Sequence, residues 1–362
     1  MIKLIKPYIS FDEVKDQFKS IFESGWLTKG TYVDQFKKAL IHYTGADYAH
    51  LTTSATTALA SCLDLLKVGE GDEVIVSDFS FPATANVVEA AGARPVFADV
   101  DPETFNMRPE ELERKITQST KAVIFVDALG NPSGIHRIAD ICKTRNIPLV
   151  EDAACALGSS EFEGKCGKIA DVTCFSFHPR KLLTTGEGGA IVTDREEWNE
   201  YLKVKLEHGA RVENGIFDFV DYGYNYRLSE LQAAMGLVQL KKLDAIVDSR
   251  IKLQQEFTRR LAPMGYRPQK ISNSVKHNVQ SLVFVVPEDI SRDGLREYLK
   301  SEGIETTFGT YCLSGCTYYR DKYKDAQPIA EELQRRTVTF PCHDDVDPEW
   351  VCDRVLLYGK RE

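Results

Sequence analysis

The sequence predicts an α/β protein with a mostly parallel central sheet, helices on both faces of that sheet, and a smaller C-terminal α+β domain. Short apolar runs alternate with helical or turn segments as far as residue 193, at Glu73–Ser77, Pro95–Asp99, Ala122–Val126, Ile147–Glu151, Val172–Phe177 and Ala190–Thr193. Such alternation is typical of strand–helix–strand units, which build parallel sheets. A long charged helical pattern, from about Leu243 to Leu261, then separates these runs from a region of different character. The length of 362 residues also favours two domains.

The second half of the chain supports this division. A serine cap and an apolar stripe predict a helix over Ser229–Leu243. The charged helix that follows ends at a group of helix-breaking residues, Pro263, Gly265 and Pro268. Beyond it we expect an apolar strand at Leu282–Val286 and helices at Arg292–Ser301 and Pro348–Leu357. The predicted domains are therefore residues 1–245 and 246–362.

Composition narrows the class of protein. With 45 basic and 54 acidic residues the net charge is −9, which gives no reason to expect a nucleic-acid or membrane partner. The N-terminus lacks an apolar signal-type region, and no stretch approaches the ~18 apolar residues of a membrane span. Nine cysteines without a pairing pattern indicate reduced thiols. We therefore expect a cytoplasmic protein.

Zinc is the one metal that the cysteines suggest. Cys312, Cys316 and the pair Cys342-His343 are possible ligands, but the short gap between the first two is the only supporting spacing. The alternative is that these cysteines serve as small apolar residues. We expect no metal site.

One lysine, Lys181, stands between two apolar runs in the segment Phe177-His-Pro-Arg-Lys-Leu-Leu-Thr-Thr-Gly-Glu187. The hydroxyls and glycines of Thr184–Gly189 make this a tightly positioned turn at a strand end, where side chains face a cleft. A lysine of ordinary pKa, ~10.4, is a poor nucleophile. Desolvation or a nearby positive charge lowers that pKa and lets the amine form a Schiff base with an aldehyde. The alternative for Lys181 alone is a solvated loop lysine.

A second segment, Leu51-Thr-Thr-Ser-Ala-Thr-Thr-Ala-Leu59, has the pattern of a helix start that binds phosphate. Four threonines and a serine crowd into six positions before an apolar-periodic stretch. Hydroxyls cap free N–H groups at the positive end of the helix dipole, and small residues let a phosphate approach them. A plain N-cap explains one of these hydroxyls, and the absence of Gly-Lys-Ser/Thr excludes a Walker loop.

A third segment, Ile147-Pro-Leu-Val-Glu-Asp-Ala-Ala154, is an apolar strand that ends in two acids. Carboxylates at the C-terminal end of a parallel strand face the ligand crevice, although Asp152 equally fits a helix cap. A lysine, a strand-end acid and a hydroxyl-rich helix start are together what pyridoxal phosphate requires. The lysine holds the aldehyde, the acid keeps the ring nitrogen protonated, and the helix start holds the phosphate.

At this point the chain resembles, nearly end to end, the DegT–StrS sugar-nucleotide aminotransferases among the fold-type I pyridoxal-phosphate enzymes. The matching motifs keep the family's order; they are Gly25-Trp-Leu-Thr-Lys-Gly30, Val33-Asp-Gln-Phe36, Thr53–Leu59, Phe81-Pro-Ala-Thr-Ala-Asn86, Glu151-Asp-Ala-Ala154, Phe175–Lys181, Thr185–Gly189, His208-Gly209 and Gly223-Tyr-Asn-Tyr-Arg227. The resemblance implies the fold-type I architecture, pyridoxal 5'-phosphate as cofactor, and a homodimer with shared active sites.

The resemblance also implies a role for each site residue. Lys181 would bind the cofactor and move protons, and Asp152 would pair with the pyridine nitrogen; these are the expected catalytic residues. Thr56, the Thr57 backbone and Ser176 would hold the phosphate, and Asn225 would reach in from the partner subunit. The full set of expected cofactor-binding residues is Ser54, Ala55, Thr56, Thr57, Phe81, Asp152, Cys155, Ser176, Lys181 and Asn225, with Phe81 stacked on the ring.

Two departures from the family pattern concern the same site. Cys155 stands where the family often has Gln or His, and a thiol is a weak donor, which predicts altered absorbance or pKa of the bound cofactor. In residues 303–314, Gly309 and Ser314 stand where the family often carries two histidines near the sugar nucleotide. The neighbouring hydroxyls either replace those donors or line the domain surface; they belong to Thr306, Thr307, Thr310 and Tyr311.

The leading hypothesis is transfer of an amino group from an amino acid, with glutamate expected, to a nucleotide-linked keto-sugar. The acidic balance then requires positive potential local to the site. An aminotransferase acting on a non-nucleotide keto-cyclitol would share all these residues. A pyridoxal-dependent sugar dehydratase is disfavoured by Lys181, because histidine replaces that lysine in the known sugar dehydratases of this group. A non-catalytic regulator would have no need of the lysine.

Overall fold

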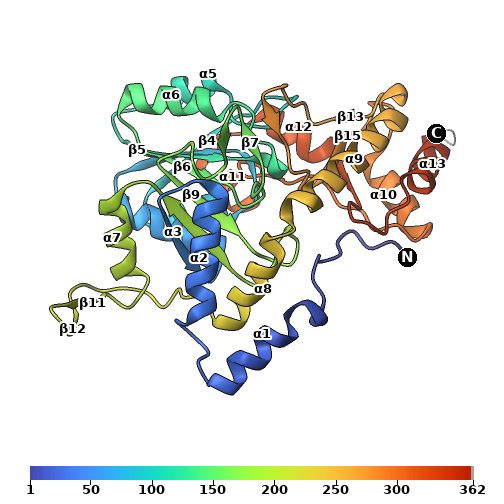
Figure 1. Cartoon of the computed structure of the whole chain (residues 1–362). Helices are drawn as coiled ribbons and strands as arrows, with labels where there is room; N and C mark the ends of the chain where they lie inside the picture. The colour runs from blue at the N-terminus through green and yellow to red at the C-terminus, as the bar shows by residue number, and fades with distance from the viewer. Residues whose placement is uncertain (360–362) are drawn as a thin grey trace.

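The computed structural model describes residues 1–359, and its centre is a seven-stranded sheet (Figure 1). The strand order is β1-β10-β9-β6-β5-β2-β4, antiparallel at β1–β10 and β10–β9 and parallel elsewhere. The strands are β1 Tyr48–Thr52, β2 Glu73–Ser77, β4 Arg94–Ala98, β5 Thr120–Val126, β6 Leu149–Asp152, β9 Val172–Ser176 and β10 Gly189–Thr193. The predicted α/β class with a mostly parallel sheet is confirmed.

All six predicted apolar runs are strands of this sheet, and they are apolar because helices cover both of its faces. The strand β6 begins two residues later than expected, since Pro148 has no N–H to give to the ladder. The strand β1 was not among the predicted runs. Its polar residues, His50 and Thr52, are buried and interrupt the apolar signal.

The two faces of the sheet carry different helices because successive strand residues point to opposite sides. One apolar cluster joins β2, β5 and β9 to α3 (Ala55–Leu65), α4 (Ala83–Ala90) and α7 (Glu196–Lys205). On the other face, α5 (Pro109–Lys115) and α6 (Ile135–Arg145) cover one end. The other end of that face is covered by α2 (Thr31–Thr44) and α8 (Glu230–Leu240). The strand ends are therefore the part of the sheet that the helices leave accessible.

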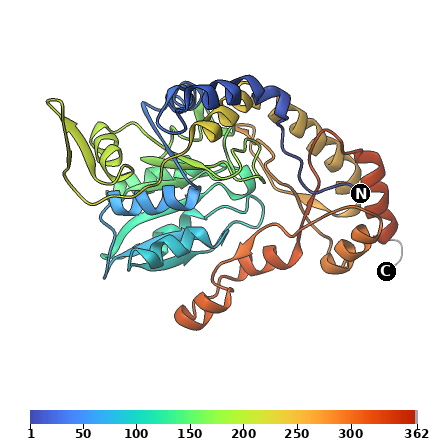
Figure 2. The ribbon, with the colours of Figure 1, turned by 90° about the horizontal axis from the view of Figure 1, so that it is seen from below.

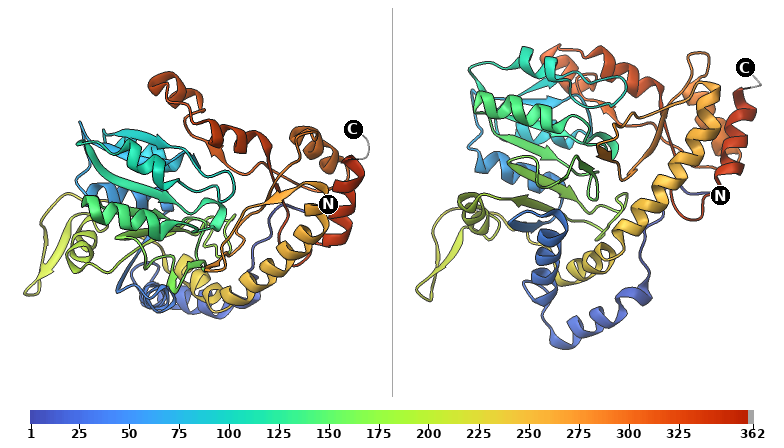
Figure 3. Two further views of the ribbon diagram at one scale, coloured as in Figure 1. Left: turned by 90° about the horizontal axis from the view of Figure 1, so that it is seen from above. Right: turned by 45° about the horizontal axis from the view of Figure 1, so that its top comes forward.

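The helix α9 (Leu243–Leu261) leads from the sheet to a smaller C-terminal unit (Figure 3). Its bounds agree with the predicted bridging helix, and a short 3-10 turn with Gly265 at a φ of 84° ends it. The helix before it, α8, is shorter than predicted, because Ser229 is its N-cap and the chain turns at Lys242 before α9. The C-terminal unit has a three-stranded sheet, β13 (Arg267–Pro268), β15 (Leu282–Val285) and β17 (Thr337–Phe340), packed against α10 (Arg292–Ser301) and α13 (Pro348–Gly359).

Not all of the C-terminal half stays in that unit. The helices α11 (Thr317–Tyr323) and α12 (Pro328–Arg336) lie beside the large sheet, away from α10 and α13 (Figure 2). Tyr319 and Leu313 belong to the same apolar cluster as β2 and α3. In the opposite direction, Ile2 pairs with Ile304, so the N-terminus lies on the C-terminal unit. The boundary after residue 245 stays a prediction, and residues 360–362 of the predicted small domain lie outside the described residues.

Two segments project from the body of the molecule in the different views (Figures 1 and 3). They are α1 (Phe11–Ser24) and the hairpin of β11 (Ala210–Glu213) and β12 (Ile216–Phe219). The hairpin exposes a run of apolar side chains, Val212, Ile216, Phe217, Phe219 and Val220. The remaining short strands are β3 (Phe79–Ser80) with β16 (Tyr311–Cys312), and β14 (Val275–Lys276) with β7 (Ser160–Glu161) and β8 (Gly164–Lys165). Within residues 1–359, no helix has the length and apolar character needed to cross a membrane.

Candidate functional site

Lys181 lies on a turn that is closed at its base by backbone hydrogen bonds. Phe177 N–H donates to the Gly188 carbonyl at 2.8 Å, and Thr185 N–H donates to the Phe177 carbonyl at 2.9 Å. The Lys181 side chain is partly buried, and its Nζ lies 3.0 Å from Cys155 Sγ as a hydrogen-bond donor. The turn therefore presents one amine in a fixed place at the ends of β9 and β10.

Asp152 ends the neighbouring strand β6 and is 5 % exposed. Thr84 Oγ1 donates to its Oδ2 at 2.8 Å, and Ala154 N–H donates to its Oδ1 at 3.2 Å. Burial raises the pKa of Asp152, while these two hydrogen bonds and the positive charge of Lys181 lower it. Because Lys181 Nζ contacts Cys155, three residues after Asp152, the predicted amine lies near the end of the strand that carries the predicted acid.

The predicted phosphate loop is the N-terminus of α3. Ser54 is the N-cap, and its hydroxyl accepts from Thr57 N–H at 3.1 Å. The N–H groups of Ala55 and Thr56 have no acceptor within residues 1–359, and the Thr56 side chain is exposed. These are the free donors that a helix start offers to an anion.

Strand pairing brings Ser176 to this helix start. Gly189 of β10 pairs with Thr52 on one side and with Ser176 on the other. A Cβ atom at Gly189 would lie 2.5 Å from the Ser54 carbonyl carbon, so only glycine allows β10 to approach the loop this closely. The structure therefore places Ser176, Ser54 and the free N–H groups around one point.

Phe81 lies at the start of α4 and is 64 % exposed. Its ring centroid is 6.1 Å from that of Tyr311, at 68° between the ring planes. This contact follows from the pairing of β3 with β16, which places the predicted substrate loop beside the predicted stacking residue. The Tyr311 side chain is exposed as well.

Within that loop, the two positions that replace the family's histidines have structural roles. Ser314 is 2 % exposed, and both its N–H and its hydroxyl donate to the Asp78 carboxylate, at 2.7 Å and 2.8 Å. A Cβ atom at Gly309 would lie 2.6 Å from Thr337 Oγ1, so a larger side chain does not fit there. The side chains of this loop that could still bond to a substrate are therefore its other hydroxyls, those of Thr306, Thr307, Thr310 and Tyr311.

Asn225 is the residue that the resemblance assigns to the site of the partner subunit. Its side chain is exposed and makes no hydrogen bond with any residue in the described part of the chain. Asn225 follows the projecting hairpin, and its backbone pairs with Glu207, which precedes that hairpin. The Asn225 side chain is therefore accessible to a second molecule.

The structure adds three residues that the sequence did not single out. Thr84 holds the Asp152 carboxylate, and the signal for it was its place in the Phe81–Asn86 motif. Gln280 accepts from Leu182 N–H at 3.1 Å and donates to the Arg180 carbonyl, bracing both sides of Lys181. Asn278 donates to the Cys155 carbonyl at 2.8 Å. Asn278 and Gln280 are isolated amides on either side of the buried Val279, and no motif in the sequence marked them as site residues.

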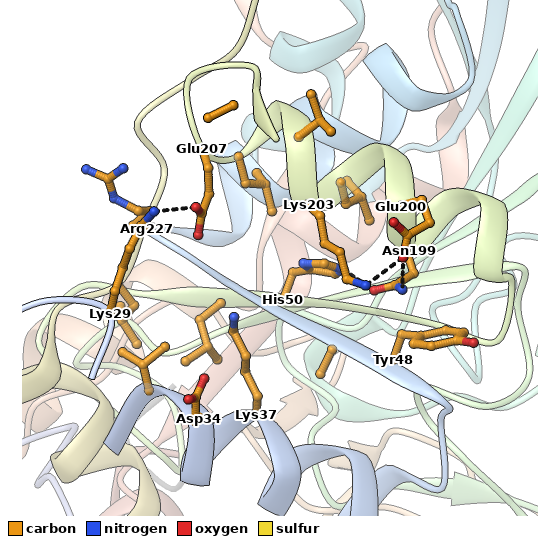
Figure 4. A pocket seen from close by; sticks show the side chains of 18 of the residues that line it. Lys29, Asp34, Lys37, Tyr48, His50, Asn199, Glu200, Lys203, Glu207 and Arg227 are labelled. Atoms are coloured by element: carbon orange, nitrogen blue, oxygen red, sulfur yellow. Dashed lines mark hydrogen bonds and ion pairs between the residues drawn. The ribbon is translucent and has the colours of Figure 1, made fainter. Parts of the chain in front are cut away.

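A cavity of about 760 Å³ lies elsewhere, between α2, β1, α7 and the β11–β12 hairpin (Figure 4). It contains neither Lys181 nor Asp152. Inside it His50 contacts Asn199 at 3.0 Å, and burial lowers the pKa of His50 to about 4. The lining residues that it shares with the motif segments are Lys29, Val33, Asp34, Leu51 and Arg227. This cavity thus lacks the predicted amine and carboxylate. We place the functional site at the strand ends, because the amine, the carboxylate and the free N–H groups lie there.

The residues at the strand ends fit pyridoxal phosphate. The free N–H groups of Ala55 and Thr56 suit its phosphate, a buried carboxylate suits its pyridinium, and an amine at the turn suits its aldehyde. The close approach of Gly189 to Ser54 leaves the helix start bare of bulky side chains.

Comparison with known proteins agrees with this chemistry. The sequence model of the DegT/DnrJ/EryC1/StrS aminotransferase family matches residues 10–356. The chain is 31 % identical to GDP-perosamine synthase of Escherichia coli O157:H7 over 98 % of this chain and 97 % of that protein. It is also 31 % identical to dTDP-4-dehydro-2,3,6-trideoxy-D-glucose 4-aminotransferase of Saccharopolyspora spinosa, over 96 % and 93 %. Among solved structures, Spr1654 of Streptococcus pneumoniae in its PLP form superposes with a TM-score of 0.91 at 27 % identity, covering 99 % of this chain and 97 % of that one.

The family match spans nearly the whole chain, and the curated relatives exceed 30 % identity over almost their full length. The chain therefore belongs to the DegT/DnrJ/EryC1/StrS aminotransferase family and is a pyridoxal-phosphate-dependent aminotransferase.

Proposed function

We propose that this aminotransferase moves an amino group from an amino acid, glutamate in the first instance, to a nucleotide-linked keto-sugar in amino-sugar biosynthesis. The observation that carries the proposal is the meeting of Lys181, Asp152 and the α3 start at the strand ends. The nucleotide-sugar part is supported by the names of the two curated relatives, each of which denotes an enzyme of a GDP- or dTDP-linked sugar.

Each residue of the site has a proposed task. Bound pyridoxal phosphate supplies the electron sink that stabilises negative charge on the substrate carbon. Lys181 Nζ would hold the cofactor and would move a proton between substrate carbons. Asp152 would keep a proton on the pyridine nitrogen, and Thr84 fixes the orientation of that carboxylate.

Phosphate binding is assigned to the helix start and to the partner subunit. Ser54 caps α3, and Ala55 and Thr57 belong to its first turn. The hydroxyls of Thr56 and Ser176 would donate hydrogen bonds to the phosphate. Asn225 of the partner subunit would complete the set in a homodimer. The exposed, unbonded Asn225 side chain and the apolar hairpin beside its segment support such an interface.

The sugar side of the site is assigned to the 306–314 loop beside Phe81. Tyr311 contacts the ring of Phe81, and Thr310 precedes it, so both are near the acceptor. We propose that the enzyme acts in the cytoplasm, because all nine cysteines are free thiols and such thiols persist under reducing conditions.

Three other functions use the same scaffold. An aminotransferase for a keto-cyclitol would use the same residues and differ only in its acceptor. A dehydratase is disfavoured by Lys181, and a non-catalytic regulator is disfavoured by the conjunction of Lys181 and Asp152. The choice among these depends on the acceptor rather than on the cofactor site.

The test is a screen of purified enzyme with glutamate against keto-sugars linked to GDP, dTDP and UDP, with a free keto-cyclitol as the matched alternative. Mass spectrometry should detect an aminated nucleotide sugar and 2-oxoglutarate in equal amounts. Amination of the cyclitol alone would overturn the nucleotide-sugar assignment. Formation of a deoxy-sugar without an added amino group, with release of ammonia beside 2-oxoglutarate, would indicate a dehydratase.

A further inference from the structure

Two carboxyl groups face each other behind the cofactor site, on the side of β6 that Asp152 does not face. Asp127 follows β5 and Glu151 lies in β6, and both are 0 % exposed. Glu151 Oε2 accepts from Thr173 Oγ1 at 2.6 Å and from Gly167 N–H at 3.0 Å. Its Oε1, and both carboxylate oxygens of Asp127, have no donor among the described residues. Three buried oxygens are therefore unaccounted for.

The surroundings offer no positive charge to this pair. The titratable groups that face it are Asp152 on β6, Cys166 in the loop after β8 and Cys174 on β9, while Tyr43 of α2 faces Cys166. None of them is basic. Burial, and next the charge of Glu151, raise the pKa of Asp127, and burial raises the pKa of Glu151. Two adjacent carboxylates in such a place cannot both stay ionised.

We propose that Asp127 and Glu151 hold one proton between them and act together as positioning residues for Asp152. The proton places an O–H donor between the two carboxyl groups and so satisfies Glu151 Oε1 and one oxygen of Asp127. Cys166 Sγ lies within 4.8 Å of the facing oxygens but makes no hydrogen bond to Asp127. The single proton thus lowers the number of unpaired buried oxygens in the pair from three to one.

The pair acts on Asp152 through the backbone. Asp127 N–H donates to the Asp152 carbonyl at 3.2 Å, and Glu151 is the residue before Asp152 on the strand. The shared proton also leaves one negative charge behind Asp152 instead of two. A second charge there would raise the pKa of Asp152 and oppose the ionised form that holds the ring-nitrogen proton. This consequence rests on the proposed role of Asp152, whereas the shared proton does not.

A bound cation is the competing explanation for the same oxygens. Asp127, Glu151 and Cys166 are the one cluster of possible metal ligands within residues 1–359. Structural zinc sites, however, close with four ligands, and this fully buried cluster has three. A shared proton pairs two of the three oxygens without a fourth ligand, so it is the explanation we adopt.

The proposal is tested on the holoenzyme with Asp127→Asn, whose amide keeps an N–H donor for Glu151 but has no proton to lose. Infrared spectra of wild type at neutral pH should contain a carbonyl band of a protonated carboxylic acid that disappears in this variant. Asp78→Asn serves as the matched control, since it removes a different buried carboxyl. Glu151→Gln tests the same band if the first variant fails to fold.

Stability and absorbance supply two readouts independent of turnover. A group whose folded pKa is raised stabilises the fold below its unfolded pKa and loses that contribution as pH rises through the folded value. Wild-type Tm should therefore fall toward alkaline pH more steeply than the Tm of Asp127→Asn. The pH at which the bound cofactor changes colour should move in Asp127→Ala and return to the wild-type value in Asp127→Asn.

Two results would overturn the inference. One is the absence of any protonated-carboxyl band that depends on Asp127 or Glu151. The other is one equivalent of metal in wild-type protein that is lost in Cys166→Ser. Because the spectra and the Tm need no substrate, they remain decisive even if the enzyme proves inactive on nucleotide sugars, and failure of the proposed function is thus separable from failure of this one.

Discussion

Lys181 is the residue on which the chemistry depends, because its amine is the only one placed at the turn between β9 and β10 with a contact to Cys155. Purified protein should be yellow, and borohydride should attach the cofactor irreversibly to Lys181. Peptide mapping after reduction measures this directly, and Lys181→Ala is the control that should stay unlabelled. Recovery of the label on a different lysine would contradict the assignment.

Asp152 can be tested without disturbing its surroundings. In Asp152→Asn the amide oxygen still accepts from Thr84, so the fold and cofactor binding should persist. Turnover should fall by about a hundredfold or more, since the neutral amide cannot stabilise a protonated ring nitrogen. Cofactor occupancy from absorbance, measured beside kcat, separates the two effects. A variant with near wild-type kcat would show that the carboxylate is only structural.

Cys155 is the residue where this chain departs from its family, and the 3.0 Å contact with Lys181 Nζ gives the departure a measurable consequence. Replacing the weak thiol with a stronger donor, in Cys155→Gln, should shift the absorbance maximum of the bound cofactor and the pH at which it changes. Cys155→Ser, a near-isosteric control, should shift them less. Identical spectra for wild type and Cys155→Gln would mean that the thiol contacts only the lysine.

At the scale of single residues, the sequence predicted those whose identity is tied to a motif. Lys181, Asp152 and Ser54 fall within short segments in which residue type and spacing carry a chemical meaning. Asn278 and Gln280 brace the same site but come from the distant C-terminal half, as isolated amides. Only tertiary packing gives them a role, so no local pattern was available to predict them.

Among the elements, β2 and β16 are joined by a buried carboxyl group, Asp78. It accepts hydrogen bonds from Ser314 N–H, Ser314 Oγ and Cys312 Sγ, and burial raises its pKa to about 7. Since the folded pKa lies above the ordinary value, the stabilising contribution is present in acid and lost as pH rises from about 4 through 7. The 311–314 segment should thus be held less firmly above pH 7.

Amide hydrogen exchange at Leu313 and Ser314 measures this attachment, because Ser314 N–H donates to the Asp78 carboxylate and Leu313 N–H donates to the Asp78 backbone carbonyl. Once intrinsic exchange is corrected for, their protection should decline between pH 6 and 8 in wild type but not in Asp78→Asn. Asp78→Ala leaves buried donors unpaired and should cost about 1–3 kcal/mol of stability. Equal protection across this pH range in wild type would contradict the raised pKa.

The sequence predicted elements well wherever both faces are covered by apolar partners. The strands β2, β5 and β9 are continuous apolar runs for this reason, and α9 was evident from its length and its Pro and Gly terminators. The two-residue strands β3 and β16 were not predictable, because a single pair of residues has no periodicity. Yet that pairing brings Tyr311 beside Phe81 and so determines the wall of the site.

For the whole molecule, two exposed features of the described residues agree with the proposed dimer. The Asn225 side chain is exposed without a hydrogen-bond partner in residues 1–359, and the hairpin before its segment exposes Phe217, which is 61 % accessible, and Phe219, which is 62 % accessible. Apolar side chains gathered on a projecting hairpin are typical of an interface. The family resemblance predicted a dimer, but no sequence pattern within one chain reveals how its surfaces meet.

The proposal that two subunits share each site can be tested by complementation. A Lys181→Ala chain lacks the amine of its own site, and an Asn225→Ala chain lacks the group it would lend to its neighbour, so each homodimer should be nearly inactive. In a mixed dimer, one site combines the intact Lys181 of the Asn225→Ala chain with the intact Asn225 of the Lys181→Ala chain. Subunit exchange should therefore restore up to about half of the wild-type activity per mixed dimer, because one of its two sites is complete.

A mixture of Lys181→Ala with Asp152→Asn is the matched control, since both changes disable a chain's own site yet leave it able to lend Asn225. In that mixture each site still carries one disabling change, and activity should not rise. If exchange is verified by mass spectrometry and the Asn225→Ala mixture stays inactive, Asn225 does not act across the interface.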